Sequence, residues 1–442
     1  MNEPFSRRIV VTMLGAGSAF TESLMKDLAL MPGNQGGEIR LIDIDGRRLA
    51  LAKSLVEQTV GLLGADWTVK ASAERAGLLP GSDYLINCVE VAGLDCVRHD
   101  YDIPMKYGVD QCIGDTVGPG GLMKGLRTIP VWLDILRDAE RLCPNALVLN
   151  YTNPMAMLCI AAVRTCSMRV VGLCHSVQGT SRLLARHAEV EYDAMDWECA
   201  GINHLAWFTR LEHEGKNLYP RLMAKARDEA SEFYEGNPIR CDMMLHFGAF
   251  ITESSGHLSE YLPYYRKRKD LLEKYARSGY RGESGFYANN WPTWRKNADE
   301  RRQRVMNGEE TPNLERSEEY ASGIIQAIET GKPFAFHGNV PNDGLIENLS
   351  PRCCVEVKCE ANGDGWTPVP FGQLPPLMAA ICESNARFQE LAAEAAVERS
   401  FEMARHALML DPLTAAVCSP AEISAMADEL FSAQREHLAG YR

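Results

Sequence analysis

Short apolar runs and longer stretches with helical spacing alternate along the first 200 residues of the chain. Ile9–Leu14 is an apolar run rich in β-branched residues, which predicts a strand, and the stretch after its terminal glycines has helical character to about Met31. Further strands are expected at Glu38–Asp43, Asp83–Val89, Ala146–Asn150 and Arg169–Leu173, and further helices at Arg47–Leu63, Leu122–Leu142 and Pro154–Cys166. This alternation predicts an α/β fold with a doubly wound parallel sheet, covered by helices on both faces.

The pattern changes near residue 200. Longer and more highly charged helices are expected at Leu222–Phe233 and Ser384–Leu410, and the strand expected at Cys353–Cys359 stands alone. A chain of 442 residues also exceeds what one hydrophobic core usually supports. We therefore predict two domains: residues 1–200 with the parallel sheet, and residues 201–442 with a mixed α/β, largely helical arrangement.

Charge and composition narrow the class of protein. A net charge of −13 argues against a nucleic-acid partner, because phosphate binding needs a basic surface. No apolar run is long enough for a membrane span. The 14 cysteines are scattered through strand-like and helix-like segments, and the first residues are typical of a strand rather than of a signal peptide. We expect a reduced, cytoplasmic protein whose cysteines are mostly small core residues.

The first strand leads into a turn with the properties of a dinucleotide site. Gly15 and Gly17 would let the backbone approach a pyrophosphate, and with Ser18 they precede a helix N-terminus that offers free N–H groups. Asp43 ends the second strand, where an acid binds the ribose hydroxyls of NAD and disfavours the 2′-phosphate of NADP. Phe20 replaces the usual third glycine, and a tight turn alone would also use glycines. The register with Asp43 favours NAD and a Rossmann-like domain.

Two further stretches contain residues that can bind a metal. Cys174 and His204 each follow a strand-like segment, and the carboxyl ends of strands are where open α/β sheets bind ligands. A thiolate with an imidazole suits a borderline divalent ion. By spacing alone, a core thiol and a hydrogen-bonded histidine would be the commoner explanation.

Several short motifs follow one another from about residue 8 to residue 435: LGAGS, LIDID, DTVGPGG, LNYTNPMAM, GLCHSVQGT, CAGINH, TESSGHLSEY, CCVEV and MLDPLTAA. Taken together and in this order, these motifs resemble glycoside hydrolase family 4. The resemblance implies a glycosidase that requires NAD and manganese and does not use the usual carboxylate pair. Cys-His-Ser-Val at 174–177 and GPGG at 118–121 are similar to the melibiase-type α-galactosidase branch.

Matching positions imply roles for individual residues. Cys174 and His204 match the manganese ligands of the family, and His175 matches its proton donor. Asn153 and Asp115 match substrate contacts. Two alternatives stay open from the residues alone: His175 could merely hydrogen-bond a group beside the metal, and Asp115 could cap the glycine-rich turn before the next helix.

The base that the resemblance implies has two candidates. Tyr261 matches the tyrosine base of the phospho-glycosidase branch, and Glu253 matches an acidic residue proposed for this role in an α-glucosidase branch. A tyrosine has a pKa of about 10, so it would need an activating cation. Tyr261 also lies close to Tyr264 and Tyr265, so it could equally belong to the core or to a sugar-stacking surface.

The implied reaction begins with hydride transfer from C3 of the sugar to NAD⁺. The metal polarises the resulting ketone, the base removes the C2 proton, and the C1 oxygen leaves with a proton from His175. Water then adds and the hydride returns, so no net oxidation occurs. The family also implies a homo-oligomer, a dimer or tetramer, with the C-terminal domain contributing substrate, metal and subunit contacts.

Three other functions stay open. The basic stretch Tyr264–Lys269 leaves room for an acidic sugar, as in an α-galacturonidase or α-glucuronidase, although Arg266–Asp270 is typical of a solvated helix start. An NAD-dependent dehydrogenase of the 2-hydroxyacid type shares the N-terminal design but would not need a thiolate beside the sheet. A catalytically inactive nucleotide sensor would not need Cys174, His204, Asn153 and His175.

Overall fold

Six parallel strands form the N-terminal half of the sheet in a computed structural model that describes residues 4–442. Their order is β3-β2-β1-β4-β5-β6, which is typical of dinucleotide-binding domains. The strands are β1 Ile9–Leu14, β2 Gly37–Ile42, β3 Trp67–Ser72, β4 Tyr84–Asn87, β5 Leu147–Asn150 and β6 Val170–Gly172. The predicted Rossmann-like, doubly wound sheet is confirmed.

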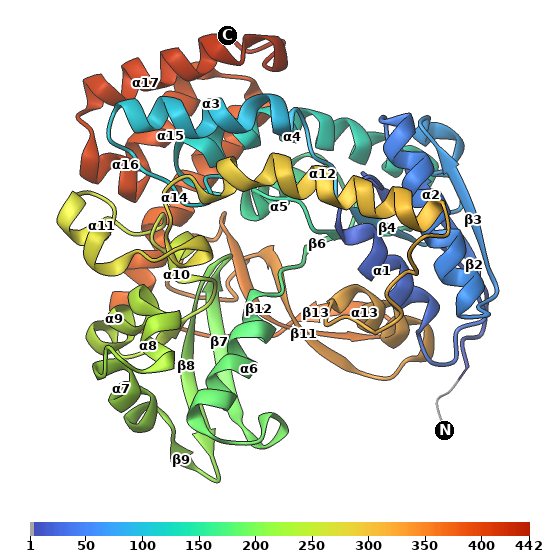
Figure 1. Cartoon of the computed structure of the whole chain (residues 1–442), viewed down its shortest axis with the longest axis horizontal. Helices are drawn as coiled ribbons and strands as arrows, with labels where there is room; N and C mark the ends of the chain where they lie inside the picture. The colour runs from blue at the N-terminus through green and yellow to red at the C-terminus, as the bar shows by residue number, and fades with distance from the viewer. Residues whose placement is uncertain (1–3) are drawn as a thin grey trace.

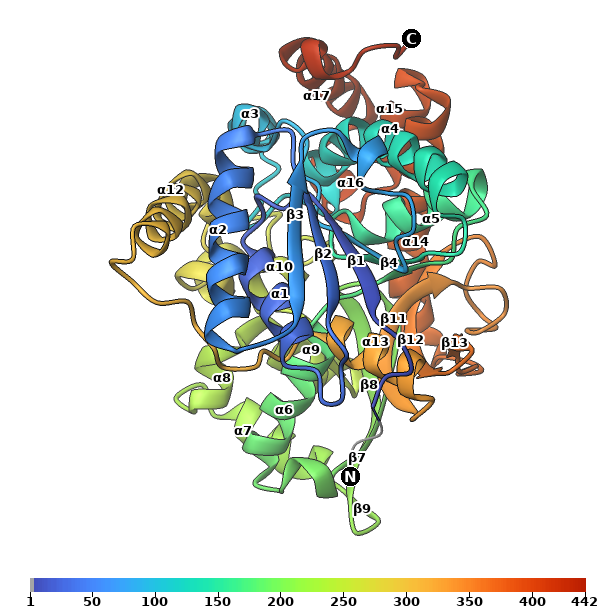
Figure 2. The ribbon, with the colours of Figure 1, turned by 90° about the vertical axis from the view of Figure 1, so that its right-hand side faces the viewer.

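Helices cover both faces of these strands. Figure 2 shows α1 and α2 on one side of β1–β3 and α4 and α5 on the other. The helices are α1 Phe20–Ala29, α2 Gly46–Leu62, α3 Gly93–Lys106, α4 Gly118–Leu142, α5 Met155–Thr165 and α6 Ser176–Ala188, with a short 3-10 turn at Arg75–Gly77. Because both faces are covered, the consecutive residues Val11, Thr12, Met13 and Leu14 of β1, which point alternately to the two faces, are all buried.

The second half of the sheet is antiparallel and continues directly from β6 through β11. Asn339 of β11 lies opposite Gly172 of β6, and the path runs on as β11-β12-β7-β8-β10, with β13 beside β12 and β9 beside β8. These strands are β7 Asp196–Ile202, β8 Leu205–His213, β9 Lys216–Asn217, β10 Phe250–Ile251, β11 Phe334–Pro341, β12 Cys354–Asn362 and β13 Gly365–Pro368. The sheet is continuous across both halves, so a domain boundary near residue 200 stays a prediction.

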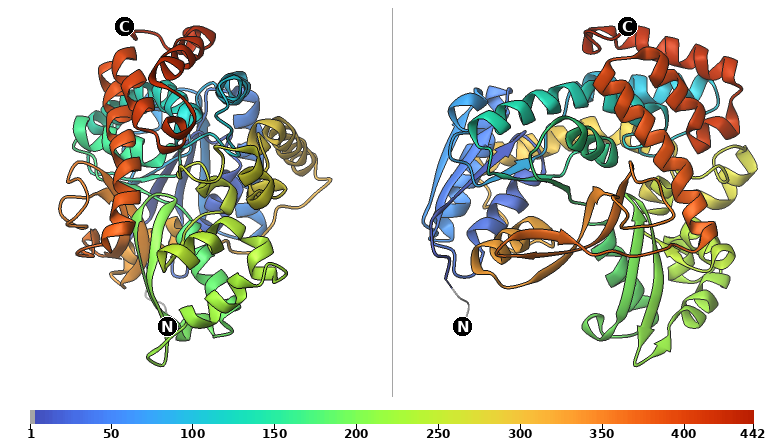
Figure 3. Two further views of the ribbon diagram at one scale, coloured as in Figure 1. Left: turned by 90° about the vertical axis from the view of Figure 1, so that its left-hand side faces the viewer. Right: turned by 180° about the vertical axis from the view of Figure 1, so that it is seen from behind.

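Most of the remaining helices flank the antiparallel strands or lie beside α3 and α4, whereas α12 (Phe286–Met306) runs across to α2 (Figure 1). Figure 3 shows α14 running from the C-terminal helices down along the antiparallel strands. The remaining helices are α7 Tyr219–Arg227, α8 Glu232–Gly236, α9 Pro238–Phe247, α10 Ser255–Leu258, α11 Lys269–Tyr275, α12 Phe286–Met306, α13 Tyr320–Thr330, α14 Pro376–Glu398, α15 Phe401–Leu410, α16 Pro412–Val417 and α17 Pro420–Ala433. The 3-10 turns in this part of the chain are η2 Tyr192–Ala194, η3 Gly279–Arg281 and η4 Arg435–His437. Within residues 4–442, no helix combines the length and apolar character that crossing a bilayer requires.

Three expectations for the second half are wrong in detail. The strand predicted to stand alone is β12, which pairs with β7, β11 and β13, partners that lie too far away in sequence for a local pattern to reveal. The helix predicted at Leu222–Phe233 is broken into α7 and α8, because Ser231 caps a new helix. The helix predicted at Ser384–Leu410 is broken at Arg399, whose φ of 53° ends α14 before Ser400 caps α15.

The charged run Arg266–Asp270 is only partly the solvated helix start that was predicted. Lys267, Arg268 and Asp270 are exposed at the beginning of α11, but Arg266 is buried. Its guanidinium donates to the Asp110 carboxylate at 2.5 Å and to the Asp110 carbonyl at 3.0 Å. The buried pair fastens this segment to the loop that precedes α4.

Asp110→Ala should lower the free energy of unfolding by about 3–5 kcal/mol, because it leaves the buried Arg266 charge without its partner. Asp270→Ala removes the exposed partner of Arg268 and should leave the free energy of unfolding nearly unchanged. Denaturant titration of both variants measures the difference. Equal losses would show that burial of the first pair has no energetic consequence.

Candidate active site

Three side chains from three elements converge beyond the carboxyl end of β6. One ligand atom from each of Cys174, His204 and Glu253 lies within 4.8 Å of the others. Cys174 follows β6, His204 occupies the turn between β7 and β8, and Glu253 follows β10. The last two have φ angles of 62° and 72°, a left-handed conformation that is uncommon for residues other than glycine. Such strain is kept where the surrounding structure requires a fixed side-chain position.

The donor set of this cluster fits a divalent metal ion. A thiolate, an imidazole and a carboxylate together suit a borderline ion such as Mn²⁺ or Zn²⁺. Burial would raise the pKa of Glu253, but the imidazoles of His204 and His257 outweigh it and lower the pKa to about 2. Beside the cluster, the fully buried Asn203 has no hydrogen-bond partner for either amide atom among residues 4–442. An ionised carboxylate and unsatisfied polar atoms at a buried point favour a bound cation.

Cys174 would have to lose its proton to bind that ion. Burial, followed by the carboxylates of Glu356 and Glu253, raises the pKa of the Cys174 thiol to about 12. The thiol donates to Ser176 Oγ at 3.3 Å at the start of α6. Since a coordinating cation displaces the thiol proton, metal affinity and deprotonation are coupled at this residue.

Tyr261 lies directly against the cluster. It is fully buried, and its hydroxyl is 3.4 Å from Nδ1 of His204. Burial and then the nearby carboxylates, first that of Glu253, raise its pKa well above the ordinary tyrosine value. Tyr264 and Tyr265 do not share this position: Tyr265 instead donates to Asp242 at 2.7 Å.

His175 follows Cys174 at the N-terminus of α6, and its side chain is 64% exposed. Its Nδ1 lies 3.6 Å from the Glu319 carboxylate. This partner raises the pKa of His175 to about 9, so the imidazole carries a proton at neutral pH. A protonated, accessible imidazole beside the cluster has the state that a general acid needs.

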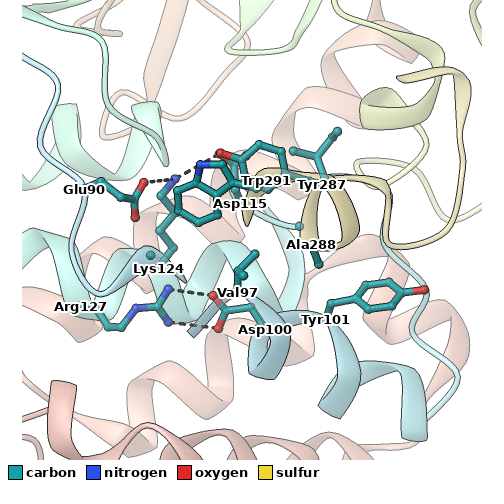
Figure 4. Close-up of a pocket in the computed structure, with 13 residues that line it drawn as sticks. Glu90, Val97, Asp100, Tyr101, Asp115, Lys124, Arg127, Tyr287, Ala288 and Trp291 are labelled. Atoms are coloured by element: carbon teal, nitrogen blue, oxygen red, sulfur yellow. Dashed lines mark hydrogen bonds and ion pairs between the residues drawn. The ribbon is translucent and has the colours of Figure 1, made fainter. Parts of the chain in front are cut away.

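Asp115 lies on the opposite side of His257 from the cluster and accepts a 3.2 Å hydrogen bond from Lys124 Nζ. Burial would raise the pKa of Asp115, but the Lys124 charge keeps it well below the usual value. Figure 4 shows this pair with Glu90, whose carboxylate is 2.9 Å from the same Nζ. Asp115 does not cap the following helix, because the first N–H of α4 donates to Asp411 at 3.1 Å.

Asn153 is not joined to this group by any hydrogen bond among the described residues. It lies half-buried in the turn between β5 and α5, before a cis peptide bond to Pro154. Its turn follows the carboxyl end of β5, the neighbour of β6, so it lies at the same edge of the sheet as Cys174.

The glycine turn after β1 packs closely against neighbouring parts of the chain. Gly15 has a φ of 77°, and a Cβ on it would lie 2.5 Å from the Cys88 carbonyl oxygen. The Gly17 N–H donates to the Asp43 carboxylate at 2.7 Å, and the Ser18 hydroxyl accepts from the Phe20 N–H at 3.3 Å. Asp43 therefore stands beside the turn, as a residue that binds a ribose must.

Two arginines that sequence reasoning missed also hold this turn. Arg48 of α2 and Arg302 of α12 both donate to the Gly17 carbonyl oxygen, the latter at 2.8 Å. Arg48 lies shortly after Asp43, so its position near the turn could have been inferred. Arg302 is almost 300 residues away, and no local signal connects it to the turn.

Glu260 is a further residue that the predictions did not include. It is buried beside Tyr261 and accepts the backbone N–H groups of Cys112, Ile113 and Gly114, the last at 3.2 Å. This carboxylate orients the loop that presents Asp115. Glu260 belongs to the motif TESSGHLSEY, and this membership could have identified it as a candidate from the sequence.

Comparisons with known proteins show the family of the chain. The model of the "Family 4 glycosyl hydrolase" matches residues 10–190, and that of the "Family 4 glycosyl hydrolase C-terminal domain" matches residues 199–414. The chain belongs to glycosyl hydrolase family 4. This glycosyl hydrolase is 37% identical to an α-galactosidase of Bacillus subtilis (strain 168), covering 98% of the chain and 99% of the relative. It is 36% identical to an α-galactosidase of Rhizobium meliloti (strain 1021), covering 98% and 89%.

Solved structures share the fold of this glycosyl hydrolase. A 6-phospho-α-glucosidase from gut microorganisms, in complex with NAD and Mn²⁺, has a TM-score of 0.83 at 20% identity, covering 99% of this chain and 100% of its own. A 6-phospho-β-glucosidase from Thermotoga maritima, with manganese, NAD⁺ and glucose-6-phosphate, has a TM-score of 0.78 at 22% identity, covering 98% and 99%. A malate dehydrogenase from Plasmodium falciparum reaches 0.51 at 12% identity over 88% of the chain. The dehydrogenase alternative thus reflects a shared fold, whereas the family is that of glycosidases.

Glu260→Gln should reduce both stability and turnover of this glycosyl hydrolase. The new amide group would face backbone N–H donors, so one donor loses its partner at a cost of about 1–3 kcal/mol in unfolding free energy. Displacement of the loop carrying Asp115 should also lower kcat/KM. Glu283→Gln is the control, because Glu283 accepts the Gly279 N–H at an exposed position. Equal effects of the two variants would contradict a role for Glu260 in holding the loop.

Proposed function

We propose that this glycosyl hydrolase cleaves α-galactosides with NAD and a divalent metal, Mn²⁺ or a similar ion, as cofactors. The observation that carries the proposal is near-full-length identity of 36–37% to two α-galactosidases, whereas the α-galacturonidase relatives reach 25–28%. The Cys174–His204–Glu253 cluster supports it with a donor set for the metal.

The basic stretch Tyr264–Lys269 and the pocket in Figure 4 offer no buried cation that lacks an acidic partner, which favours a neutral sugar over a uronide at these two places. Of the basic stretch that suggested a uronide, Arg266 is neutralised by Asp110, and the exposed Arg268 is paired with Asp270 on α11. A buried carboxylate of a substrate would need a cation without another partner. Lys269 pairs with Glu273, and Lys267, which has no ion-pair partner among the described residues, is exposed rather than buried.

The cations of the pocket in Figure 4 are also already paired. Lys124 is held between Glu90 and Asp115. Arg127 donates two hydrogen bonds to Asp100, at 3.1 and 2.7 Å. Hydroxyl groups of a galactosyl ring can share these carboxylates without disturbing the charge balance, whereas another carboxylate would add an uncompensated charge.

The residues that would hold the cofactors lie at two places on the sheet. Gly15, Gly17, Ser18 and Asp43 would bind NAD, while Cys174 and His204, with Glu253, would bind the metal. When bound, NAD⁺ would accept and return a hydride and the metal ion would polarise a carbonyl, chemistry that protein side chains lack.

The chain itself would move two protons. His175, which the Glu319 carboxylate keeps protonated, donates its proton to the departing C1 oxygen.

Tyr261 removes the C2 proton. An imidazole that binds a cation through Nε2 carries its proton on Nδ1, and Nδ1 of His204 faces the Tyr261 oxygen at 3.4 Å. This N–H favours tyrosinate. Asp115 and Asn153 orient the sugar hydroxyls, and Glu253 is the alternative base.

Further expectations remain part of the proposal. The family models meet between residues 190 and 199, which supports a division into an NAD-binding unit, 1–200, and a substrate, metal and oligomerisation unit, 201–442. We propose a cytoplasmic homo-oligomer, a dimer or tetramer, that acts on a small glycoside. Gel filtration with light scattering measures the oligomer directly.

Enzyme treated with chelator and charcoal should be inactive on p-nitrophenyl α-galactoside and should recover only when NAD⁺ and Mn²⁺ are both restored. The matching α-galacturonide and β-galactoside should be cleaved at least about 100-fold more slowly, because a misplaced charge or bond costs several kcal/mol. Full activity without either cofactor, or preference for the uronide, would overturn the proposal.

Cys174→Ser sharpens this test, because it should abolish Mn²⁺-dependent turnover and leave NAD⁺ affinity nearly unchanged. Cys166→Ser is the matched control: Cys166 is also half-buried but follows α5, at the opposite edge of the sheet. If Cys174→Ser lost NAD⁺ affinity and turnover together, Cys174 would be a packing residue.

Hydrolysis in D₂O should give galactose that carries deuterium at C2, because the proton removed there is replaced from solvent. Tyr261→Phe should slow this exchange by about 10²–10⁴-fold, the usual effect of losing a general base. NMR of the product measures the label. If Glu253→Gln slows exchange and Tyr261→Phe does not, Glu253 is the base; an unlabelled C2 would exclude the elimination route.

A further inference from the structure

Five aromatic side chains gather at η3 and the first half of α12. We call this group the aromatic face; its members are Tyr280, Phe286, Tyr287, Trp291 and Trp294. The Tyr287 and Trp291 rings stack at 5.1 Å, and the Phe286 and Trp294 rings meet edge to face at 5.2 Å. Tyr280 is 52% exposed and the other four are half-buried. Aromatic area on this scale that stays open to solvent is typical of a binding surface.

The aromatic face is fixed to the candidate active site at two points. The Gly285 and Tyr287 N–H groups donate to the carbonyl oxygens of Gln111 and Cys112, at 2.8 and 3.0 Å, in the loop that presents Asp115. At the other end, η3 packs on α10: a Cβ on Gly256 would lie 2.5 Å from the Tyr280 carbonyl oxygen. The rings therefore have a set position relative to the catalytic cluster.

Tyr287 and Trp291 line the same pocket as Asp115 and Lys124 (Figure 4). This pocket encloses only about 20 Å³, room for one water molecule, so a sugar ring cannot enter it. A ring bound at Asp115 must lie across its mouth. The group joined to that ring through the glycosidic oxygen then extends over the neighbouring side chains.

The chemistry of the aromatic face selects one kind of occupant. Aromatic faces carry negative charge and attract the weakly positive C–H edges of another ring, and the C–H groups of a pyranose point to its two faces. The hydroxyls at the rim of such a ring stay in water, which suits half-buried rather than fully buried rings. Lys124 and Arg127 are both paired with carboxylates, so the wall offers no cation without a partner.

Resting on the proposed α-galactosidase function, we propose that the aromatic face is a leaving-group subsite that binds the second sugar ring of an oligosaccharide. The enzyme is then adapted to galactosides whose leaving group is itself a sugar. Recognition comes from stacking rather than from hydrogen bonds alone, so the subsite accepts different linkages better than it accepts a small alkyl group.

Trp291→Ala tests the subsite with two substrates, a galactosyl-glucose disaccharide and methyl α-galactoside. The variant should lower kcat/KM about tenfold for the disaccharide, mainly through KM, and less than about twofold for the methyl glycoside. Trp291→Phe should retain most of the disaccharide activity because it keeps an aromatic ring. Lys296→Ala, an exposed change on the same helix, should alter neither substrate.

The outcomes separate the subsite from the function on which it rests. Wild-type enzyme that cleaves neither galactoside would contradict the proposed function. Cleavage of both substrates with equal losses in Trp291→Ala would contradict the subsite, since the side chain would then only support α12 or Asp115. Thermal unfolding of each variant, with NAD⁺ affinity, shows whether a loss reflects folding.

Discussion

The pairing of β6 with β11 is the contact on which the site depends. A single register pair, Gly172 with Asn339, joins the parallel and antiparallel halves of the sheet. Gly172 is required there, because a Cβ would lie 2.4 Å from Met155 Sδ and 2.9 Å from Asn339 Cβ. Asn339 also donates to the buried Glu356 at 3.1 Å, and Glu356 pairs in register with Gly201. This short series of pairs places the end of β6, with Cys174, beside the end of β7, with His204.

The electrostatic balance of the site depends on this pairing of β6 with β11. The ionised carboxylates of Glu253 and Asp115 lie on either side of His257, which burial keeps neutral by lowering its pKa to about 4. Burial raises the pKa of the neighbouring Glu356 to about 7. Lys124 forms ion pairs with Asp115 and Glu90. Among the described residues, no Lys or Arg forms an ion pair with Glu253, whose partners are the imidazoles of His204 and His257, and the candidate metal donors meet at this point.

Helix α12 connects the two ends of the site. Its 21 residues span about 30 Å at 1.5 Å per residue. Near its first turn, backbone N–H groups bind the loop before Asp115, and near its last turn Arg302 binds the glycine turn after β1. A single helix in contact with both the pocket wall and the glycine turn sets the distance between these two parts of the candidate site.

The sequence by itself determined the parallel half of the fold and the chemistry of the site. Strands buried on both faces carry continuous apolar runs, and the glycine turn with Asp43 is a local arrangement, so both can be read from neighbouring residues. Edge strand β3 and helix α3 were not predicted, although the alternation of Trp67, Val69 and Ala71 with polar residues is a strand signal that could have identified β3. The resemblance supplied Cys174, His175, His204, Tyr261 and Glu253 as chemical types at matching positions.

Only the tertiary structure decided how these residues meet. Strand β12 pairs with β7, more than 150 residues earlier, and Arg302 reaches Gly17 across almost 300 residues. Arg266 belongs to a run that is otherwise exposed, yet packing buries it against Asp110. The Asp411 cap on α4 likewise comes from a distant loop. A local pattern reveals periodicity and turn chemistry. Contacts between distant residues instead require long loops to close, and the entropy cost of closing these loops is offset only when the whole sheet has formed.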